Sequence, residues 1–255
     1  MAEGIVVKEM KRTYANRLAL SSDDLIFRAF TRDKGYILED SGKRPTHPER
    51  YRINNSSPYA NPLWTKLDAY YKWSACLLMF EDVRWVDKSM KVVDLGAGEG
   101  PICHIIADMG YDVVGVDIKP WNYPYQSLVR MVIKDGVEFL EEYEDESVDI
   151  FIDGCAVTHF DTRHNASTPN LGWKSVFENV ARVMKPNGYF IVTSDVLLED
   201  NDYKGEFISP EQIAEMAEAS GLELTSDFNY SRNNCLMRLE PAGNMGVANF
   251  MFVKK

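Results

Sequence analysis

Residues 92–103 read VVDLGAGEGPIC, an apolar run that ends in an acid and three alternating glycines. A buried strand, a tight turn and the start of a helix give this pattern, because glycine lets the backbone turn sharply and approach a ligand closely. Such turns bind several nucleotide-like ligands, and the spacing of the glycines distinguishes between them.

The spacing disfavours the two phosphate-binding turns. A dinucleotide turn needs G-x-G-x-x-G, because its third glycine lets the helix pack close to the strand. Here the glycines are Gly96, Gly98 and Gly100, and Pro101 occupies the position of that third glycine. The Gly-Lys-Ser/Thr sequence of a nucleoside-triphosphate loop does not occur in this turn.

Strand and helix signals alternate from residue 91 onward, which is typical of a parallel α/β sheet. We predict strands over 91–96, 111–117, 130–136, 147–154, 189–195, 222–228 and 246–255, and helices over 63–82, 101–110, 136–146, 173–185 and 208–221. The expected architecture is a Rossmann-like, doubly wound α/β domain with a mostly parallel seven-stranded sheet and helices on both faces. Residues 85–255 would form this domain. Residues 1–84 would form a mainly helical and loop N-terminal cap, or lid, that shapes the substrate site.

Charge and composition limit the partners. The net charge is −11, and residues 91–255 hold 27 acidic against 13 basic residues. An acidic body of this kind repels phosphate backbones, which disfavours nucleic acid as a partner. The chain shows neither a long apolar run nor a signal peptide, and its four cysteines are scattered. We therefore expect a cytoplasmic protein without membrane contact, and leave a homodimer open.

The quoted turn resembles that of the class I, Rossmann-like S-adenosylmethionine-dependent methyltransferases, in particular those acting on small molecules and glycans. Four further motifs follow in the family's order over about residues 91–228: VVGVD, IKDGVEF, DIFIDGCAV and VARVMKPNGYFIVTSD. The last one departs from the family's Lys-Pro-Gly-Gly turn, because Asn187 replaces the first glycine.

The resemblance implies S-adenosylmethionine as the cofactor. It assigns Asp117 to the ribose diol, Asp135 to the adenine amino group and Asp153 to the reactive end. An NAD enzyme would also use an acid at Asp117. Asp94 would act indirectly by fixing the loop, or would cap a helix. The full set of expected cofactor residues is Asp94, Gly96, Ala97, Gly98, Asp117, Ile118, Asp135, Gly136, Asp153 and Gly154.

The charge of the cofactor agrees with this assignment. S-adenosylmethionine carries a sulfonium cation and no phosphate, so its site needs carboxylates and backbone dipoles rather than a basic clamp. The four aspartates meet that need, whereas a pyrophosphate would be repelled.

The segment after the fourth predicted strand, DGCAVTHFDTRHN, resembles the Ser-x-x-x-Glu-His stretch of many small-molecule methyltransferases. His159 matches the histidine and is a candidate general base, because an imidazole titrates near neutral pH. It would otherwise cap the strand or pack under the cofactor. Trp121, Arg163 and His164 are candidate acceptor contacts, with a solvated loop as the alternative for Arg163 and His164. We predict no metal site.

The sequence therefore predicts methyl transfer to a small-molecule acceptor, with a hydroxyl group of a sugar, nucleotide-sugar or glycan precursor favoured. N-methylation of a metabolite or protein side chain stays open, as does a catalytically silent methyltransferase-like subunit. An NAD-linked oxidoreductase is a distant alternative.

Overall fold

The computed structural model describes residues 62–85, 88–98, 101–120, 129–157, 160, 171–197, 209–225, 237–238 and 245–255. Its elements are α3 (Pro62–Val83), β1 (Lys91–Leu95), α4 (Pro101–Asp108), β2 (Asp112–Asp117), β3 (Arg130–Ile133), α5 (Gly136–Glu141), β4 (Val148–Gly154), α6 (Leu171–Val183), β5 (Met184–Leu197), α7 (Pro210–Ala219), β6 (Leu222–Leu224), β7 (Met237–Arg238) and β8 (Met245–Lys254). The predicted helices and the strand cores all have a counterpart in this order.

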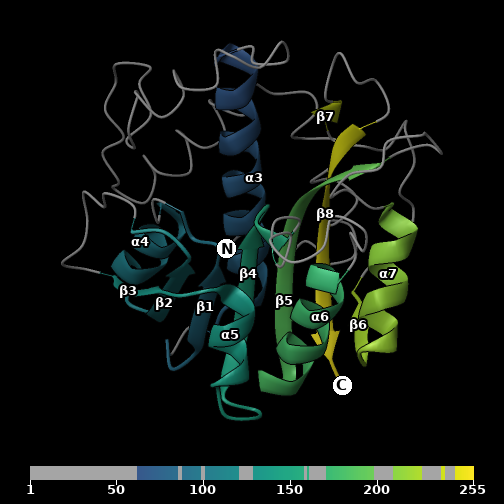
Figure 1. The fold of residues 1–255 in the computed structure, drawn as a ribbon. Helices are drawn as coiled ribbons and strands as arrows, with labels where there is room; N and C mark the ends of the chain where they lie inside the picture. Colours follow the sequence, from purple (N-terminus) through teal and green to yellow (C-terminus); the bar gives the residue numbers. More distant parts are fainter. Residues whose placement is uncertain are drawn as a thin grey trace, which may run out of the picture.

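The strands form one mixed sheet in the order β3-β2-β1-β4-β5-β8-β6, and the two-residue β7 pairs with β8 (Figure 1). Strands β1 to β5 run parallel, whereas β8 is antiparallel to both β5 and β6. Strand β1 is the topological switch point of the sheet, because β2 and β3 lie on one side of it and β4 on the other. The predicted Rossmann-like, mostly parallel sheet is confirmed.

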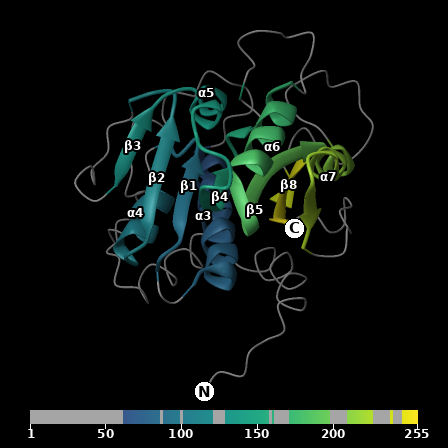
Figure 2. The ribbon, with the colours of Figure 1, turned by 90° about the horizontal axis from the view of Figure 1, so that it is seen from below.

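Helices cover both faces of the sheet. Figure 2 shows α3 and α4 on one face and α5, α6 and α7 on the other. Each face has its own apolar core, one around Phe80, Ile106 and Ile152 and the other around Phe151, Phe177 and Phe252. The strands between them are buried on both sides, and their sequences are accordingly near-continuous apolar runs.

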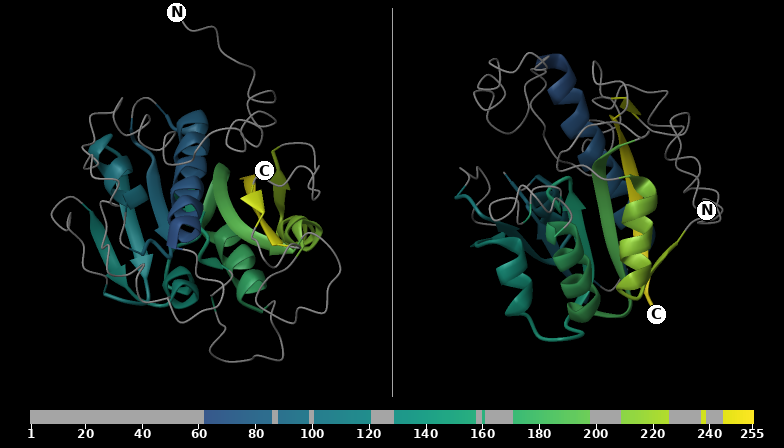
Figure 3. Two further views of the ribbon diagram at one scale, coloured as in Figure 1. Left: turned by 90° about the horizontal axis from the view of Figure 1, so that it is seen from above. Right: turned by 45° about the vertical axis from the view of Figure 1, so that its right-hand side comes forward.

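Helix α3 supplies much of the first core. Cys76, Leu77 and Phe80 are fully buried there together with Ile152 of β4 and Ile191 of β5. The amino-terminal half of α3 projects beyond the ends of β1 and β4 (Figures 1 and 3). The division of the chain near residue 84 stays a prediction, and residues 1–61 lie outside the described part.

Helix α7 lies within the predicted range 208–221, and capping residues set its two ends. The hydroxyl of Ser209 accepts the N–H of Gln212 at 3.3 Å, and the Gln212 side chain accepts the N–H of Ser209 at 2.9 Å. Pro210 begins the helix, and Gly221 follows its end at a φ of +81°. This reciprocal capping satisfies backbone donors that the first turn would otherwise leave unpaired.

Strand β5 begins earlier than predicted. The sequence places a helix-breaking turn at KPNGY, whereas the strand already starts at Met184 and includes Lys185–Gly188. The pairing with β4 shifts register between Val148 and Ile150, so these residues form an irregular first section of the strand. Asn187 has a φ of +62°, a left-handed conformation that glycine and asparagine tolerate best.

Candidate functional site

The turn after β1 has the shape that its glycines predict. Gly96 and Gly98 have φ values of +67° and +58°, and the N–H of Ala97 bonds to the carbonyl of Val116 on β2 at 2.9 Å. A Cβ placed on Gly96 would lie 2.0 Å from the Cβ of Ala156. The chain after β4 therefore crosses directly against this turn, which leaves no room for a side chain.

Asp117 joins the end of β2 to the same turn. Its Oδ2 accepts the N–H of Gly98 at 2.8 Å, and its Oδ1 accepts the N–H of Lys119 at 2.9 Å. Each carboxylate oxygen keeps a further lone pair for a ligand. The neighbouring Ile118 is exposed, which places an apolar side chain beside the carboxylate.

Asp135 and Gly136 begin helix α5. Oδ1 of Asp135 accepts the N–H of Val137 at 3.0 Å, so the residue caps the helix. A Cβ on Gly136 would lie 2.6 Å from the ring of Phe160, and the same ring comes within 3.8 Å of a Cβ on Gly96. Phe160 thus lies between the two predicted cofactor segments. The role of Asp135 in binding adenine stays a prediction.

Asp94 lies beneath the turn and is 1% exposed. The thiol of Cys103 on α4 donates to its Oδ2 at 3.2 Å. Burial raises the pKa of Asp94 to about 8, against the lowering effect of that thiol, and the charges of Asp153 and Asp117 raise it further. The sequence left open that Asp94 caps a helix. Among its described contacts, the thiol of Cys103 rather than a helix N–H group connects the carboxylate to α4.

Asp153 is the penultimate residue of β4, pairs with Leu95 of β1 and is fully buried. Its Oδ1 accepts the N–H of Ala156 at 2.7 Å, whereas its Oδ2 has no hydrogen-bond partner within the described residues. Burial raises its pKa to about 7, although nearby backbone N–H groups and Lys72 lower it. A buried carboxylate oxygen without a partner is costly, and a cation beside it would offset that cost.

Asp149, on the same strand, provides a comparison. Lys185 Nζ lies 2.9 Å from both of its carboxylate oxygens, and the N–H of Lys91 donates to Oδ2 at 2.8 Å. Both aspartates are buried, but Asp149 is fully paired at the amino end of β4. The unpaired oxygen is therefore specific to the carboxyl end of the strand, where the predicted site lies.

Sequence reasoning missed a lysine at this end of the sheet. Lys72 of α3 is 5% exposed, and its Nζ lies 2.8 Å from Oδ1 of Asp195 on β5. Oδ2 of Asp195 accepts the thiol of Cys155 at 3.4 Å, and Cys155 has a φ of +80°. Lys72 falls on the same helical stripe as the buried Cys76 and Phe80, four and eight residues later, and this spacing was the signal that could have revealed it.

The remaining candidates can be placed only in part. His159, Trp121, Arg163 and His164 lie outside the described residues. Gly154 follows Asp153, where a Cβ would touch Ile102 at 3.3 Å. In the described part of the chain no group of three or more metal-ligating side chains gathers, and no helix there is long and apolar enough to cross a membrane.

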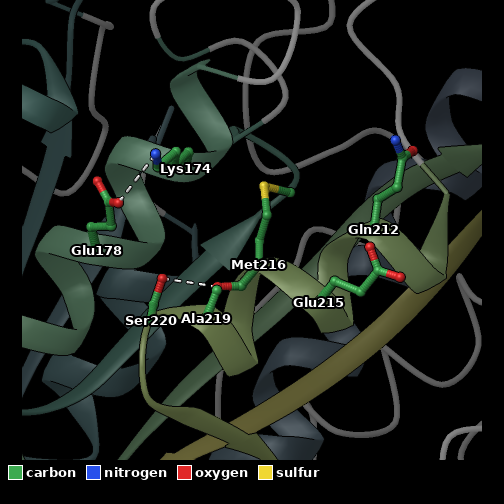
Figure 4. A pocket seen from close by; sticks show the side chains of 7 residues that line it. All are labelled: Lys174, Glu178, Gln212, Glu215, Met216, Ala219 and Ser220. Carbon is green, nitrogen blue, oxygen red and sulfur yellow. Dashed lines mark hydrogen bonds and ion pairs between the residues drawn. The ribbon is translucent and has the colours of Figure 1, made fainter.

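A groove on the surface is separate from this site. Figure 4 shows it between α6 and α7, and it contains none of the predicted cofactor residues. Its lining residues are Lys174, Glu178, Gln212, Glu215, Met216, Ala219 and Ser220.

The carboxyl edge of the sheet, where the parallel strands β1, β2 and β4 end, fits S-adenosylmethionine on two observations. The glycine turn excludes a Cβ and so allows close approach of the backbone, and Asp153 presents a buried carboxylate oxygen that a cation can satisfy. Asp117 stands at the end of β2 with lone pairs available for a diol. These three groups are two carboxylates and a backbone turn, and none of them is a basic side chain, so the arrangement suits a cationic nucleoside rather than a pyrophosphate.

Residues 93–192 match the model of a protein family described as a methyltransferase domain. A putative sarcosine dimethylglycine methyltransferase from Galdieria sulphuraria has a similar fold, with a TM-score of 0.55 and 18% identity over 90% of this chain and 98% of that one. The 1,6-didemethyltoxoflavin-N1-methyltransferase of Burkholderia thailandensis, bound to 1,6-didemethyltoxoflavin and S-adenosylhomocysteine, gives a TM-score of 0.52 and 16% identity over 86% and 98%. No curated protein sequence matches the chain.

The family match and the fold together support an S-adenosylmethionine-dependent methyltransferase, with a methyltransferase domain that includes residues 93–192 and a Rossmann-like fold. The predicted enzyme class and cofactor are confirmed. The same fold also serves other chemistry, since the [4+2]-cyclase SpnF matches with a TM-score of 0.51 and 17% identity over 74% of this chain and 81% of that one.

Proposed function

We propose that the protein methylates a hydroxyl group of a small-molecule acceptor, of the sugar, nucleotide-sugar or glycan-precursor kind. The observation that carries the donor half of this proposal is the unpaired Oδ2 of Asp153, buried at the carboxyl edge of the sheet beside the glycine turn. In the proposed complex this oxygen faces the positive charge of the donor, and Asp117 accepts the ribose hydroxyls.

The acceptor half rests on His159, six residues beyond Asp153 in the chain. When bound, S-adenosylmethionine supplies a methyl group already activated on a sulfonium sulfur. A hydroxyl acceptor must lose its proton as its oxygen attacks, and the imidazole of His159 would take that proton. Asp153 and the glycine turn would hold the reactants in line and keep water out.

Donor binding is the first test. Because binding stabilises the folded state by about 2.7 kcal/mol at a hundredfold excess over Kd, S-adenosylmethionine should raise the melting temperature clearly. A protein that shows no such shift and no heat of binding does not use this donor.

The acceptor test uses S-adenosylmethionine with a radiolabelled methyl group and two panels, one of sugars and nucleotide-sugars and one of primary and secondary amines. We expect label on a hydroxyl oxygen. His159→Ala should lower kcat by at least about a hundredfold, with partial recovery at high pH, where the hydroxyl ionises without a base. Label on amines alone would overturn the hydroxyl proposal.

N-methylation is the second candidate. It is favoured by the names of two proteins of similar fold, the 1,6-didemethyltoxoflavin-N1-methyltransferase and the putative sarcosine dimethylglycine methyltransferase. An amine acceptor needs no base once it is deprotonated, so His159→Ala would then leave kcat within a few-fold of the parent. A protein that binds the donor but methylates nothing in either panel would match the third alternative, a silent binding subunit.

A further inference from the structure

The backbones of strands β4 and β5 stop pairing at Gly154 and Thr193, the last partners in their register. Beyond that point a side-chain bond continues the connection, because the thiol of Cys155 donates to Oδ2 of Asp195 at 3.4 Å. A thiol is a weak donor, but the acceptor here is a charged carboxylate, which strengthens the bond. The bond therefore holds the first residue after β4 against β5.

Asp195 is itself fixed from two sides. Its backbone belongs to the antiparallel pairing of β5 with β8, where its partner is Val247. Its other carboxylate oxygen, Oδ1, lies 2.8 Å from Nζ of Lys72 on α3, and only 17% of the Asp195 side chain is exposed. The carboxylate is thus a fixed anchor at the carboxyl edge of the sheet, and the segment that leaves β4 is the part that it holds.

The segment held in this way, residues 155–157, makes two contacts within the predicted donor site. The N–H of Ala156 donates to Oδ1 of Asp153 at 2.7 Å, while Oδ2 has no hydrogen-bond partner within the described residues. Ala156 also packs on the glycine turn, because its Cβ lies 2.0 Å from the place of a Cβ on Gly96. One short segment therefore sets both the orientation of the Asp153 carboxylate and the packing against the turn.

The backbone of this segment needs outside support. Cys155 has a φ of +80°, a left-handed conformation that residues with a side chain rarely adopt. A backbone of this kind persists only where the surrounding structure holds it in place. The bond to Asp195 is one such contact, and it comes from β5 rather than from β4.

We propose that Asp195 is a positioning residue for donor binding: through the Cys155 thiol it holds the segment after β4 in the conformation that presents Asp153 to the cationic donor. This inference rests on the proposed function, because it assumes that S-adenosylmethionine meets Asp153. It gives a role in donor binding to a residue outside the range 93–192 that matches the methyltransferase-domain model.

Calorimetry on the full chain measures the Kd of S-adenosylmethionine, and urea unfolding measures the stability of the same variants. Cys155→Ala removes the thiol and keeps the left-handed backbone under strain. The Kd should rise at least about fivefold, as it does when the binding-competent fraction of the protein falls to about one fifth. Cys155→Ser keeps a donor for Asp195 and should retain a Kd within about twofold of the parent.

Cys155→Gly separates positioning from stability. Glycine adopts this backbone without strain, so the urea midpoint should stay level or rise. The Kd should still rise as in Cys155→Ala, because the bond to Asp195 is lost. A merely structural role for this bond predicts that affinity follows stability, and a parental Kd in Cys155→Gly would overturn the proposal.

Glu146→Gly is the matched control. Glu146 is exposed, precedes β4 at the other end of the strand and also has a left-handed backbone, with a φ of +51°. The change relieves similar strain away from the site, so it should leave the Kd of the donor unchanged. A Kd raised as much as in Cys155→Gly would contradict the inference, because the effect would not depend on the bond to Asp195.

Asp195→Ala completes a double-mutant cycle with Cys155→Ala. Because both changes act through one bond, the double variant should bind the donor no more weakly than the weaker of the two single variants. Losses of affinity that multiply would contradict the inference. If Asp195→Ala does not fold, the three Cys155 variants still decide the question. A parent protein that binds no S-adenosylmethionine refutes the proposed function itself, which is a distinguishable result.

Discussion

Asp117 and Gly98 are joined by a 2.8 Å hydrogen bond from the backbone N–H to the carboxylate, which ties the end of β2 to the turn after β1. The same carboxylate is the predicted ribose acceptor. Asp117→Asn replaces an anionic acceptor by a neutral amide, and hydrogen bonds to a charged group contribute about 1.5–3 kcal/mol each. We expect the Kd of S-adenosylmethionine to rise at least tenfold, measured by calorimetry.

The control for this change is Asp112→Asn, at the exposed amino end of the same strand. It removes the same charge from the protein without touching the turn, so it should leave the Kd unchanged. Equal losses in both variants would mean that overall charge, rather than the position of Asp117, governs binding.

Gly96→Ala should cost both stability and binding. The left-handed backbone at this position costs about 1–2 kcal/mol with a side chain, and the new Cβ would collide with Ala156. We expect the free energy of unfolding in urea to fall by more than about 2 kcal/mol, with donor affinity lost alongside it. Gly221→Ala has similar strain at a φ of +81° and open space around it. It should lose only about 1–2 kcal/mol and bind the donor normally.

The stability of the donor-free protein should depend on pH through Asp94 and Asp153. Both pKa values are raised by burial, to about 8 and about 7. The folded state therefore holds protons that the unfolded chain releases near pH 4, and stability falls as the pH rises from about 4 to about 8. Urea unfolding at pH 5 and pH 8.5 measures the difference. Asp94→Asn should reduce it, and an unchanged difference would exclude Asp94 as a source.

Ser209→Ala tests the cap of helix α7 apart from the site. Loss of the side-chain acceptor for Gln212 should lower the free energy of unfolding by about 1 kcal/mol. The Kd of the donor should not change, because the helix lies on the opposite face of the sheet from α3 (Figure 2) and packs against β6 and α6 rather than against the glycine turn. Weakened donor binding would show that the α7 region communicates with the site.

The fold was predictable because its signals are local. The apolar runs, the glycine turn and the capping residues of α7 each specify an element, and the parallel order brings the ends of β1, β2 and β4 to one edge. The convergence of Asp94, Asp117 and Asp153 follows from that geometry. The ligand roles assigned to them remain predictions.

The pair formed by Lys72 and Asp195 was not predictable in the same way. Its members lie 123 positions apart in the sequence and meet only because α3 packs across β4 and β5. The sequence predicts this helix as part of the N-terminal cap, and nothing in its pattern gives its lysine a role. The irregular start of β5 was missed for a related reason: a turn-like sequence was accommodated within a strand whose pairing with β4 continues beyond it.

Strand β8 lies between β5 and β6, although it comes after both in the chain. While a ribosome is making the protein, β6 has no partner until residues 245–254 emerge, and the long strand β5 keeps an open edge that can pair with other chains. The sheet therefore closes late. Nascent chains that stall before residue 245 should aggregate readily and should need chaperones, even though every residue of the proposed donor site has already been made.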